Sequence, residues 1–147
     1  MAEQASTDIT IYCKGNIGAT RLGDCIFTQK ALFCLSLHGL KAERKYIDLA
    51  NKPQSFLDLN KVKDDSFKVI YGKDKDGKDA EWKASCPVLE DRKNKVRIFD
   101  SGAICDYLEE NYKPAVLAKD PEQEVPGKKH TYTHTPFISV FTLYLTI

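Results

Sequence analysis

Hydrophobic and polar positions alternate in residues 8–14, which read Asp-Ile-Thr-Ile-Tyr-Cys-Lys and are rich in β-branched side chains. This period of two predicts a β-strand. From residue 26 the spacing becomes that of a helix with two largely apolar stripes, made of Ile26, Lys30, Phe33 and Leu37 and of Phe27, Ala31, Cys34, Leu35 and His38. Such a helix packs between a sheet and other helices, and Gly39 predicts its end.

The next segments continue an α/β pattern. Residues 42–49 predict a second strand, and its distance from the first strand suits a right-handed βαβ unit with parallel strands. A short helix should follow, with Asn51 as its N-cap and Pro53 in its first turn. The residues expected on its buried face are Phe56, Leu57 and Leu59.

Regular signals resume after residue 85. Residues 86–89 and 96–99 predict an antiparallel pair of strands joined by a polar turn at 91–95. Asp100, Ser101 and Gly102 predict the cap of a helix over residues 103–112, which Pro114 would end. The residues expected on its inward face are Ile104, Tyr107, Leu108 and Tyr112. The order βαβ and then ββα, with a cysteine at the first helix, is typical of a thioredoxin-like domain.

The charged segment 61–84 is the least regular part of the chain. Residues 67–71 predict the first strand of a hairpin, the Asp76-Gly77 step predicts its turn, and residues 81–83 would form the returning strand. We interpret the whole segment as a charged insertion on the surface. Residues 113–129 are typical of a linker, and residues 131–147 fit either one strand or the beginning of a buried helix.

Charge and length exclude several function classes. The 22 basic residues nearly balance the 21 acidic ones, so nothing indicates nucleic-acid binding. The N-terminus lacks the basic and apolar regions of a secretory signal, and the longest apolar run, residues 31–37, is too short for a stable membrane span. Five cysteines without a Cys-x-x-Cys or a metal-type spacing indicate separate thiols in the cytoplasm. His130 and His134 lack further ligands, so no metal is expected.

Cys25 is the candidate reactive residue. It lies at the start of the predicted first helix, where unpaired amides and the positive end of the helix dipole favour a thiolate. A buried and inert cysteine that begins a core helix is the alternative. Thr28 stands three residues later, so no internal disulfide can close there and an external thiol such as glutathione would complete a redox cycle. Cys13, Cys34 and Cys105 are expected to pack in the core.

Several motifs occur together and in one order along the chain. They are Gly-Asp-Cys-Ile-Phe-Thr-Gln at 23–29, Asn-Lys-Pro-Gln-Ser-Phe-Leu at 51–57, Cys-Pro-Val-Leu at 86–89, Asp-Ser at 100–101 and Leu-Glu-Glu at 108–110. Over roughly residues 9–117 the chain resembles the glutathione-dependent dehydroascorbate reductases of plants and algae. These belong to the glutathione transferase superfamily, close to its omega class and to the chloride intracellular channel proteins.

The resemblance implies a thioredoxin-like, glutathione-binding domain over residues 1–113, the N-terminal domain of the glutathione transferase fold. Residues 114–147 would then be a linker and the truncated start of the family's all-helical C-terminal domain, which is otherwise largely missing. A missing second domain uncovers apolar surface on the first. If this apolar surface is covered, we expect a monomer. If it is uncovered, we expect the chain to self-associate.

The resemblance also implies a role for each matching residue. Cys25 would be the nucleophile, and Pro87 would follow a cis peptide bond. The residues implied to contact glutathione or ascorbate are Lys14, Asp24, Lys52, Val88, Asp100 and Ser101. Read without the family, Asp100 and Ser101 are a plain helix cap and Lys14 and Asp24 are solvated charges.

The implied activity is the reduction of dehydroascorbate to ascorbate by a ping-pong reaction through Cys25. Glutathione is the co-substrate, a mixed disulfide is the intermediate, and no bound cofactor is expected. Three alternatives remain open. One is an omega-class-like thioltransferase, and another is a non-enzymatic protein, like the chloride intracellular channels, that acts at membranes or on partners. The third is a glutathione-binding module that truncation leaves without activity.

Overall fold

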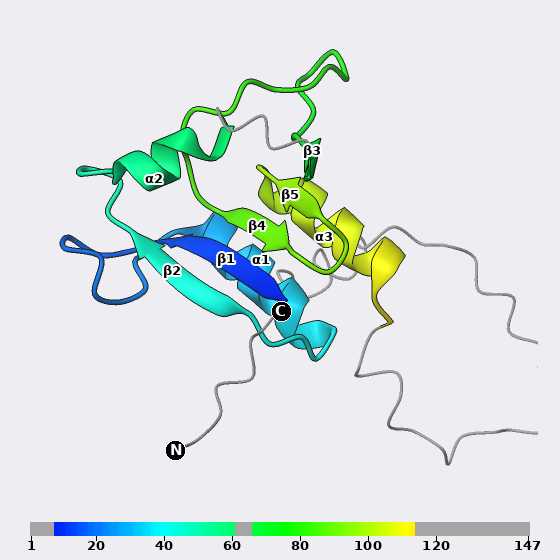
Figure 1. Ribbon diagram of the computed structural model, residues 1–147, viewed down its shortest axis with the longest axis horizontal. Helices are drawn as coiled ribbons and strands as arrows, with labels where there is room; N and C mark the ends of the chain where they lie inside the picture. Colours follow the sequence, from blue (N-terminus) through cyan, green and yellow to red (C-terminus); the bar gives the residue numbers. More distant parts are fainter. Residues whose placement is uncertain (1–7, 61–65, 114–147) are drawn as a thin grey trace, which may run out of the picture.

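A computed structural model describes residues 8–60 and 66–113 of the 147-residue chain. The expected linker and the start of a second domain, residues 114–147, lie outside the described residues, as do His130 and His134. Figure 1 shows the elements in chain order: β1 (Ile9–Lys14), α1 (Ile26–Leu37), β2 (Glu43–Ile47), α2 (Gln54–Leu57), a 3-10 turn (Asp58–Asn60), β3 (Lys68–Ile70), β4 (Val88–Asp91), β5 (Val96–Ile98) and α3 (Ser101–Asn111).

The strands form one five-stranded sheet in the order β2-β1-β4-β5-β3. β1 and β2 are parallel, as the βαβ spacing predicts, and β4 runs antiparallel to both β1 and β5. The predicted α/β architecture is therefore confirmed. The N-cap of α3 is also as predicted, because the Asp100 side chain accepts hydrogen bonds from the backbone nitrogens of Gly102 and Ala103.

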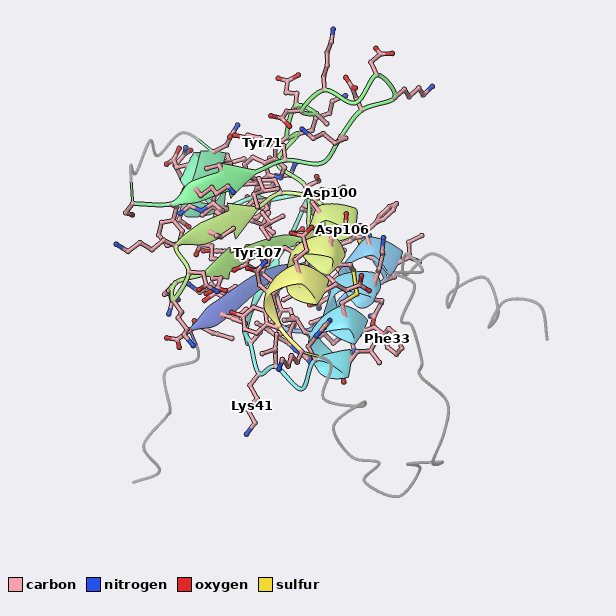
Figure 2. The ribbon with its side chains drawn as sticks, turned by 90° about the vertical axis from the view of Figure 1, so that its right-hand side faces the viewer. Phe33, Lys41, Tyr71, Asp100, Asp106 and Tyr107 are labelled. Atoms are coloured by element: carbon pink, nitrogen blue, oxygen red, sulfur yellow. A yellow bond between two sulfur atoms is a disulfide. The ribbon has the colours of Figure 1, made fainter. Side chains whose placement is uncertain are left out.

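Two cores lie on opposite faces of the sheet, since successive strand residues point to opposite sides. On one face, α1 and α3 lie side by side (Figure 2) and cover Ile9, Ile11 and Cys13 of β1. On the other face, Phe56 of α2 and Tyr12 of β1 belong to a largely aromatic core. The starts of α1 and α3 thus belong to the same layer of helices.

The described part of the 61–84 segment differs from the predicted surface hairpin. Lys68–Ile70 adds a fifth strand to the main sheet, parallel to β5, and residues 81–83 form no strand. The turn itself is present, with Gly77 at a φ of +75° and an isolated antiparallel bridge between Lys73 and Asp79. Trp82 packs against the rings of Phe56 and Phe99, with centroid distances of 5.3 and 4.6 Å. Burial of this aromatic surface draws the segment into the fold despite its charged flanks.

The first turn of α2 is also shifted from the prediction. Its N-cap is Pro53 and its first helical residue is Gln54, so Asn51 is not the cap. The side chain of Asp48 accepts from the backbone nitrogen of Ala50, and the backbone nitrogen of Asn51 donates to the Asp48 carbonyl. Asn51 therefore belongs to a turn with Asp48 that precedes α2, and it does not cap the helix.

The cysteines depart from the expectation of separate thiols. Cys34 of α1 and Cys105 of α3 form a disulfide across the helix layer, with their Cα atoms 5.9 Å apart. Each is inward-facing on its own helix, but a sequence separation of 71 residues hides the pairing from any local pattern. Cys13, Cys25 and Cys86 are the free cysteines of the described residues.

Candidate functional site

Cys25 is the N-cap residue of α1, in extended conformation with φ −90° and ψ 113°. Its carbonyl accepts from the backbone nitrogen of Gln29 at 3.0 Å, while its side chain makes no capping hydrogen bond. The thiol is partly exposed, so it is neither deeply buried nor engaged with the first-turn amides. A thiol in this place is accessible to a substrate and lies at the positive end of the helix dipole.

The end of β1 holds the start of α1 in place. Thr28 is fully buried, and its hydroxyl accepts from the backbone nitrogen of Lys14 at 3.3 Å. Gly23 donates from its backbone nitrogen to the Lys14 carbonyl at 2.9 Å. A Cβ at Gly23 would lie 2.7 Å from the carbonyl oxygen of Gly15, so only glycine fits there. The position of Cys25 therefore depends on tertiary contacts with β1 as well as on helix geometry.

Lys14 and Asp24, both implied ligand contacts, pair with each other at the rim of the site. The Nζ of Lys14 donates to Asp24 at 2.7 Å, and the Asp24 side chain is 90% exposed. The hydrogen bond with Lys14 holds the pKa of Asp24 below its usual value, and the hydrogen bond with Asp24 raises the pKa of Lys14. Both residues flank Cys25 in a charged state at neutral pH.

The loop before β4 carries a second free thiol, Cys86, which is buried in the aromatic core. The peptide bond between Cys86 and Pro87 is cis, as the family resemblance implies. Burial raises the pKa of the Cys86 thiol to about 12, the Cys13 and Cys25 thiols add to the rise, and Lys52 opposes it. Lys52 is half-buried in the segment that precedes α2.

Val88 occupies a different environment from the other implied contacts. It is fully buried, lies opposite Tyr12 in the β1–β4 pair, and belongs to the aromatic core. Its side chain thus has a structural place, and a role in ligand binding would fall to its backbone.

The start of α3 forms one side of a groove. The Oδ1 atom of Asp100 accepts from the nitrogens of Gly102 and Ala103 at 2.8 and 2.9 Å, and Ser101 is buried. Asp100 adjoins a groove of about 200 Å³ whose other lining residues are Gly72, Ala80, Glu81, Trp82, Lys83, Ser85 and Phe99. Since Ser85 immediately precedes Cys86, this groove runs from α3 toward the cis-proline loop. Figure 2 shows Asp100 at the start of α3, close to Tyr71.

Sequence reasoning missed two residues of this region. Trp82 lines the groove although its segment was expected on the surface. Lys30 of α1 reaches the start of α3, where its Nζ lies 3.9 Å from the point that a Cβ of Gly102 would occupy. The helical stripe that contains Lys30 indicates its helix face, but only the packing of α1 on α3 shows which helix start it approaches. A cation at the positive end of a helix favours a carboxylate ligand.

Residues 8–60 and 66–113 contain no group of three or more His, Cys, Asp or Glu side chains that could hold a metal ion. In the same ranges no helix has the length and apolar character to cross a membrane.

The chain is similar to known proteins in sequence and fold. Residues 24–111 match the family model of the glutathione S-transferase N-terminal domain. The chain is 31% identical over 118 residues to the probable glutathione S-transferase DHAR2, chloroplastic, of Oryza sativa subsp. japonica, which covers 80% of this chain and 35% of the relative. It is 30% identical over 135 residues to the glutathione S-transferase DHAR3, chloroplastic, of Arabidopsis thaliana. This match covers 91% of this chain and 43% of the relative.

The crystal structure of Chlamydomonas reinhardtii dehydroascorbate reductase aligns with a TM-score of 0.49 and 24% identity, over 71% of this chain and 38% of that one. The chain therefore spans less than half the length of these relatives.

Proposed function

Because the chain belongs to the family of glutathione S-transferase N-terminal domains, we propose that it binds glutathione and reduces dehydroascorbate through Cys25. The observation that carries the proposal is a partly exposed thiol at a helix start, with no cysteine three residues later. Such a monothiol needs an external thiol for turnover, and glutathione is the thiol of this family. The DHAR names of the rice and Arabidopsis relatives support the choice of acceptor.

The reaction proceeds in three balanced steps. The Cys25 thiolate gives two electrons to dehydroascorbate, so that ascorbate leaves and, with water, a sulfenic acid remains on the sulfur. One glutathione condenses with this sulfenic acid, releases water and forms a mixed disulfide. The thiolate of a second glutathione attacks the mixed disulfide, which releases glutathione disulfide and restores Cys25.

The other residues bind and orient the tripeptide. Lys52 meets the glycyl carboxylate, and the backbone of Val88 after the cis Pro87 pairs with the cysteinyl part, as the resemblance implies. At the other end, the start of α3 attracts the γ-glutamyl carboxylate, with Ser101 as a donor. Asp100 uses Oδ1 for its own helix, so Oδ2 is the oxygen that would accept from the γ-glutamyl ammonium group.

Lys14 and Asp24 form the charged rim beside Cys25, where dehydroascorbate would approach. Lys14 offers an ammonium group to the substrate oxygens. Asp24 fixes the position of that ammonium group through their ion pair. Exchange of Asp24 for asparagine therefore weakens substrate positioning without removing the nucleophile.

The decisive experiment compares Cys25→Ser with Cys13→Ser in a glutathione-dependent dehydroascorbate reduction assay. Cys25→Ser should abolish turnover, whereas Cys13→Ser should retain it, because Cys13 is fully buried in β1. Turnover that survives Cys25→Ser would refute the assignment. The same protein is also assayed on a glutathionylated peptide. A dehydroascorbate reductase should reduce dehydroascorbate faster than it reduces the peptide, whereas a thioltransferase should reduce the peptide faster. Binding to liposomes in the absence of both activities would favour the channel-like alternative.

A further inference from the structure

Lys30 of α1 lies beside the start of α3. β1 and β5 each run antiparallel to β4, and α1 follows β1 as α3 follows β5, so the two helices begin at the same edge of the sheet. The disulfide between Cys34 and Cys105 then joins them, with the two Cα atoms 5.9 Å apart. Lys30 precedes Cys34 by one helical turn, and Ser101 precedes Cys105 by one helical turn. The pairing of the helices therefore brings Lys30 next to Ser101.

The ammonium group of Lys30 lacks a counter-charge in this place. Its Nζ lies 3.9 Å from the point that a Cβ of Gly102 would occupy, and the Oδ1 atom of Asp100 lies 3.0 Å from the same point. Lys30 is half-buried, and within residues 8–60 and 66–113 it makes no hydrogen bond or ion pair. A cation is unfavourable at the positive end of a helix unless an anion joins it. The arrangement is therefore typical of a site whose anionic ligand is a separate molecule.

The space between these two charged groups is open. Asp100 and Gly102 line a groove of about 350 Å³, and Gly102 leaves free the volume that a Cβ would fill. Farther along α3 the same groove is lined by Asp106 and Glu110, whose negative charges repel a carboxylate. Figure 2 shows Asp106 on α3, beyond Asp100. The start of α3, beside Lys30, is therefore the end of the groove that suits a carboxylate.

The geometry points to Lys30 as the residue that recognises the α-carboxylate at the γ-glutamyl end of glutathione. This inference rests on the proposed function and adds a residue to its site. An α-amino acid carries its carboxylate and its ammonium group on one carbon atom, so such a group can meet Lys30 and the Asp100 carboxylate at the same time. The co-substrate is then a thiol peptide with a complete α-amino-acid group at this end.

The distance from the proposed nucleophile agrees with this role. Lys30 lies five residues after Cys25, about 7.5 Å along α1. In glutathione two methylene groups and an amide bond separate the α-amino-acid group from the cysteinyl residue, which is a comparable length. A peptide bound with its sulfur at Cys25 therefore brings its α-carboxylate toward Lys30.

Calorimetric titration of the full chain with two peptides tests the proposal. One peptide is S-methylglutathione, whose sulfur cannot exchange with Cys25 or with the disulfide. The other is S-methyl-4-aminobutyryl-cysteinylglycine, which differs from the first only in lacking the α-carboxylate. The variants are Lys30→Met, which keeps the apolar stem, and Lys30→Arg, which keeps the charge. Lys41→Met is the matched control, because Lys41 is exposed and follows the other end of α1 (Figure 2).

Lys30→Met should weaken the binding of S-methylglutathione about tenfold, because a charge-assisted hydrogen bond is lost. Wild type should bind the decarboxylated peptide about tenfold more weakly than S-methylglutathione, and Lys30→Met should not weaken that binding further. Lys30→Arg should retain most of the affinity for S-methylglutathione, and Lys41→Met should behave as wild type with both peptides. Equal weakening of both peptides by Lys30→Met, or no weakening of either, overturns the proposal.

The titrations contain no dehydroascorbate, so they separate this proposal from the function. The expected coupling without reductase activity would refute the proposed substrate and keep the role of Lys30. Reductase activity in a chain whose Lys30→Met variant binds both peptides as wild type does would keep the function and remove that role. A wild-type chain that binds neither peptide would refute both.

Discussion

Asp91, the last residue of β4, holds α3 on the sheet and provides a sharp test of that packing. Its carboxylate is fully buried and accepts from the hydroxyl groups of Tyr107 and Tyr112 and from two nitrogens of Asn94. Tyr107 belongs to α3 and Tyr112 is its C-cap, so Asp91 connects the end of that helix to the β4–β5 turn. Since the same helix begins at the candidate groove, its anchoring also positions Asp100.

We expect Asp91→Ala to lower the free energy of unfolding by about 3 kcal/mol. A hydrogen bond to a charged group contributes about 1.5–3 kcal/mol, and a buried donor without an acceptor costs about 1–3 kcal/mol. Asn94 is exposed and Tyr112 is partly exposed, so water can replace the lost acceptor for these two. Most of the lost stability therefore comes from buried Tyr107. The total decrease in the free energy of unfolding stays well below that expected for four buried hydrogen bonds.

The pH dependence gives the prediction a sign. Burial alone would raise the pKa of Asp91, but hydrogen bonds from Tyr112, Asn94 and Tyr107 outweigh it and lower the pKa below 3.8. A carboxyl group with a lowered folded pKa stabilises the fold above its unfolded pKa, and this stabilisation is lost as the pH falls through the folded pKa. The difference between wild type and Asp91→Ala should therefore be constant near neutrality and shrink in acid below pH 3.8.

Urea unfolding at several pH values measures the effect, with Tyr107→Phe and the double variant completing a mutant cycle. Tyr107→Phe should cost about 1–2 kcal/mol, because only the hydroxyl is lost. The double variant should lose less than the sum of the two single changes. A loss below about 1 kcal/mol for Asp91→Ala, or strict additivity in the cycle, would refute the role given to this carboxylate.

Three further predictions concern the helix layer. Thr28→Val should lower the free energy of unfolding by about 1–2 kcal/mol and disorder the start of α1, which a changed rate of Cys25 alkylation would report. Thr28→Ser should behave as wild type, because it keeps the hydroxyl that accepts from the backbone nitrogen of Lys14. Reduction of the Cys34–Cys105 disulfide, which spans 71 residues, should lower stability by about 2–4 kcal/mol in urea unfolding, and Cys34→Ala should lose this sensitivity to reductant. In sedimentation the 147-residue chain should associate with rising concentration, because Ile26 and Phe27 of α1 are 72% and 56% exposed; a monomer at all concentrations would contradict this.

The elements that the sequence predicts well are those with a complete local signal. β1 alternates, α1 has helical spacing up to Gly39, and the Asp100 cap of α3 needs only the residues that follow it. Cys25 belongs to this group, since the break between strand and helix identifies its place. The order of these elements is enough to give the α/β class.

The remaining features depend on partners far along the chain. The strand at 68–70 is predicted, but its partner is not, because β3 pairs with β5 and not with residues 81–83. The disulfide likewise follows only from the packing of α1 on α3. Trp82 looks like part of a charged surface hairpin until its packing against the rings of Phe56 and Phe99 is seen. No local pattern contains these contacts, because in each case the free energy comes from burial against a distant segment.

One of the two predicted stripes of α1 illustrates the same limit. Ala31, Cys34 and Leu35 of the second stripe are buried, whereas Ile26 and Phe33 of the first stripe are exposed by 72% and 50%. Phe27, at the start of the second stripe, is also exposed, by 56%. Periodicity shows that both faces are apolar, but it cannot show what covers each of them. In the described residues the sheet and α3 account for one face only. The spacing of residues thus identifies two apolar faces on α1, and only the fold shows which of them the sheet and α3 bury.

The two halves of the candidate site differ in how they depend on the disulfide. Cys34 lies nine residues after Cys25, about 14 Å along α1, while Cys105 lies four residues after Ser101, about 6 Å along α3. Cys25 is held separately by the contacts of Thr28 and Gly23 with Lys14. Opening the disulfide should therefore move the start of α3 more than the start of α1. Glutathione binding through the γ-glutamyl group should weaken on reduction, while alkylation of Cys25 in the absence of glutathione should change little.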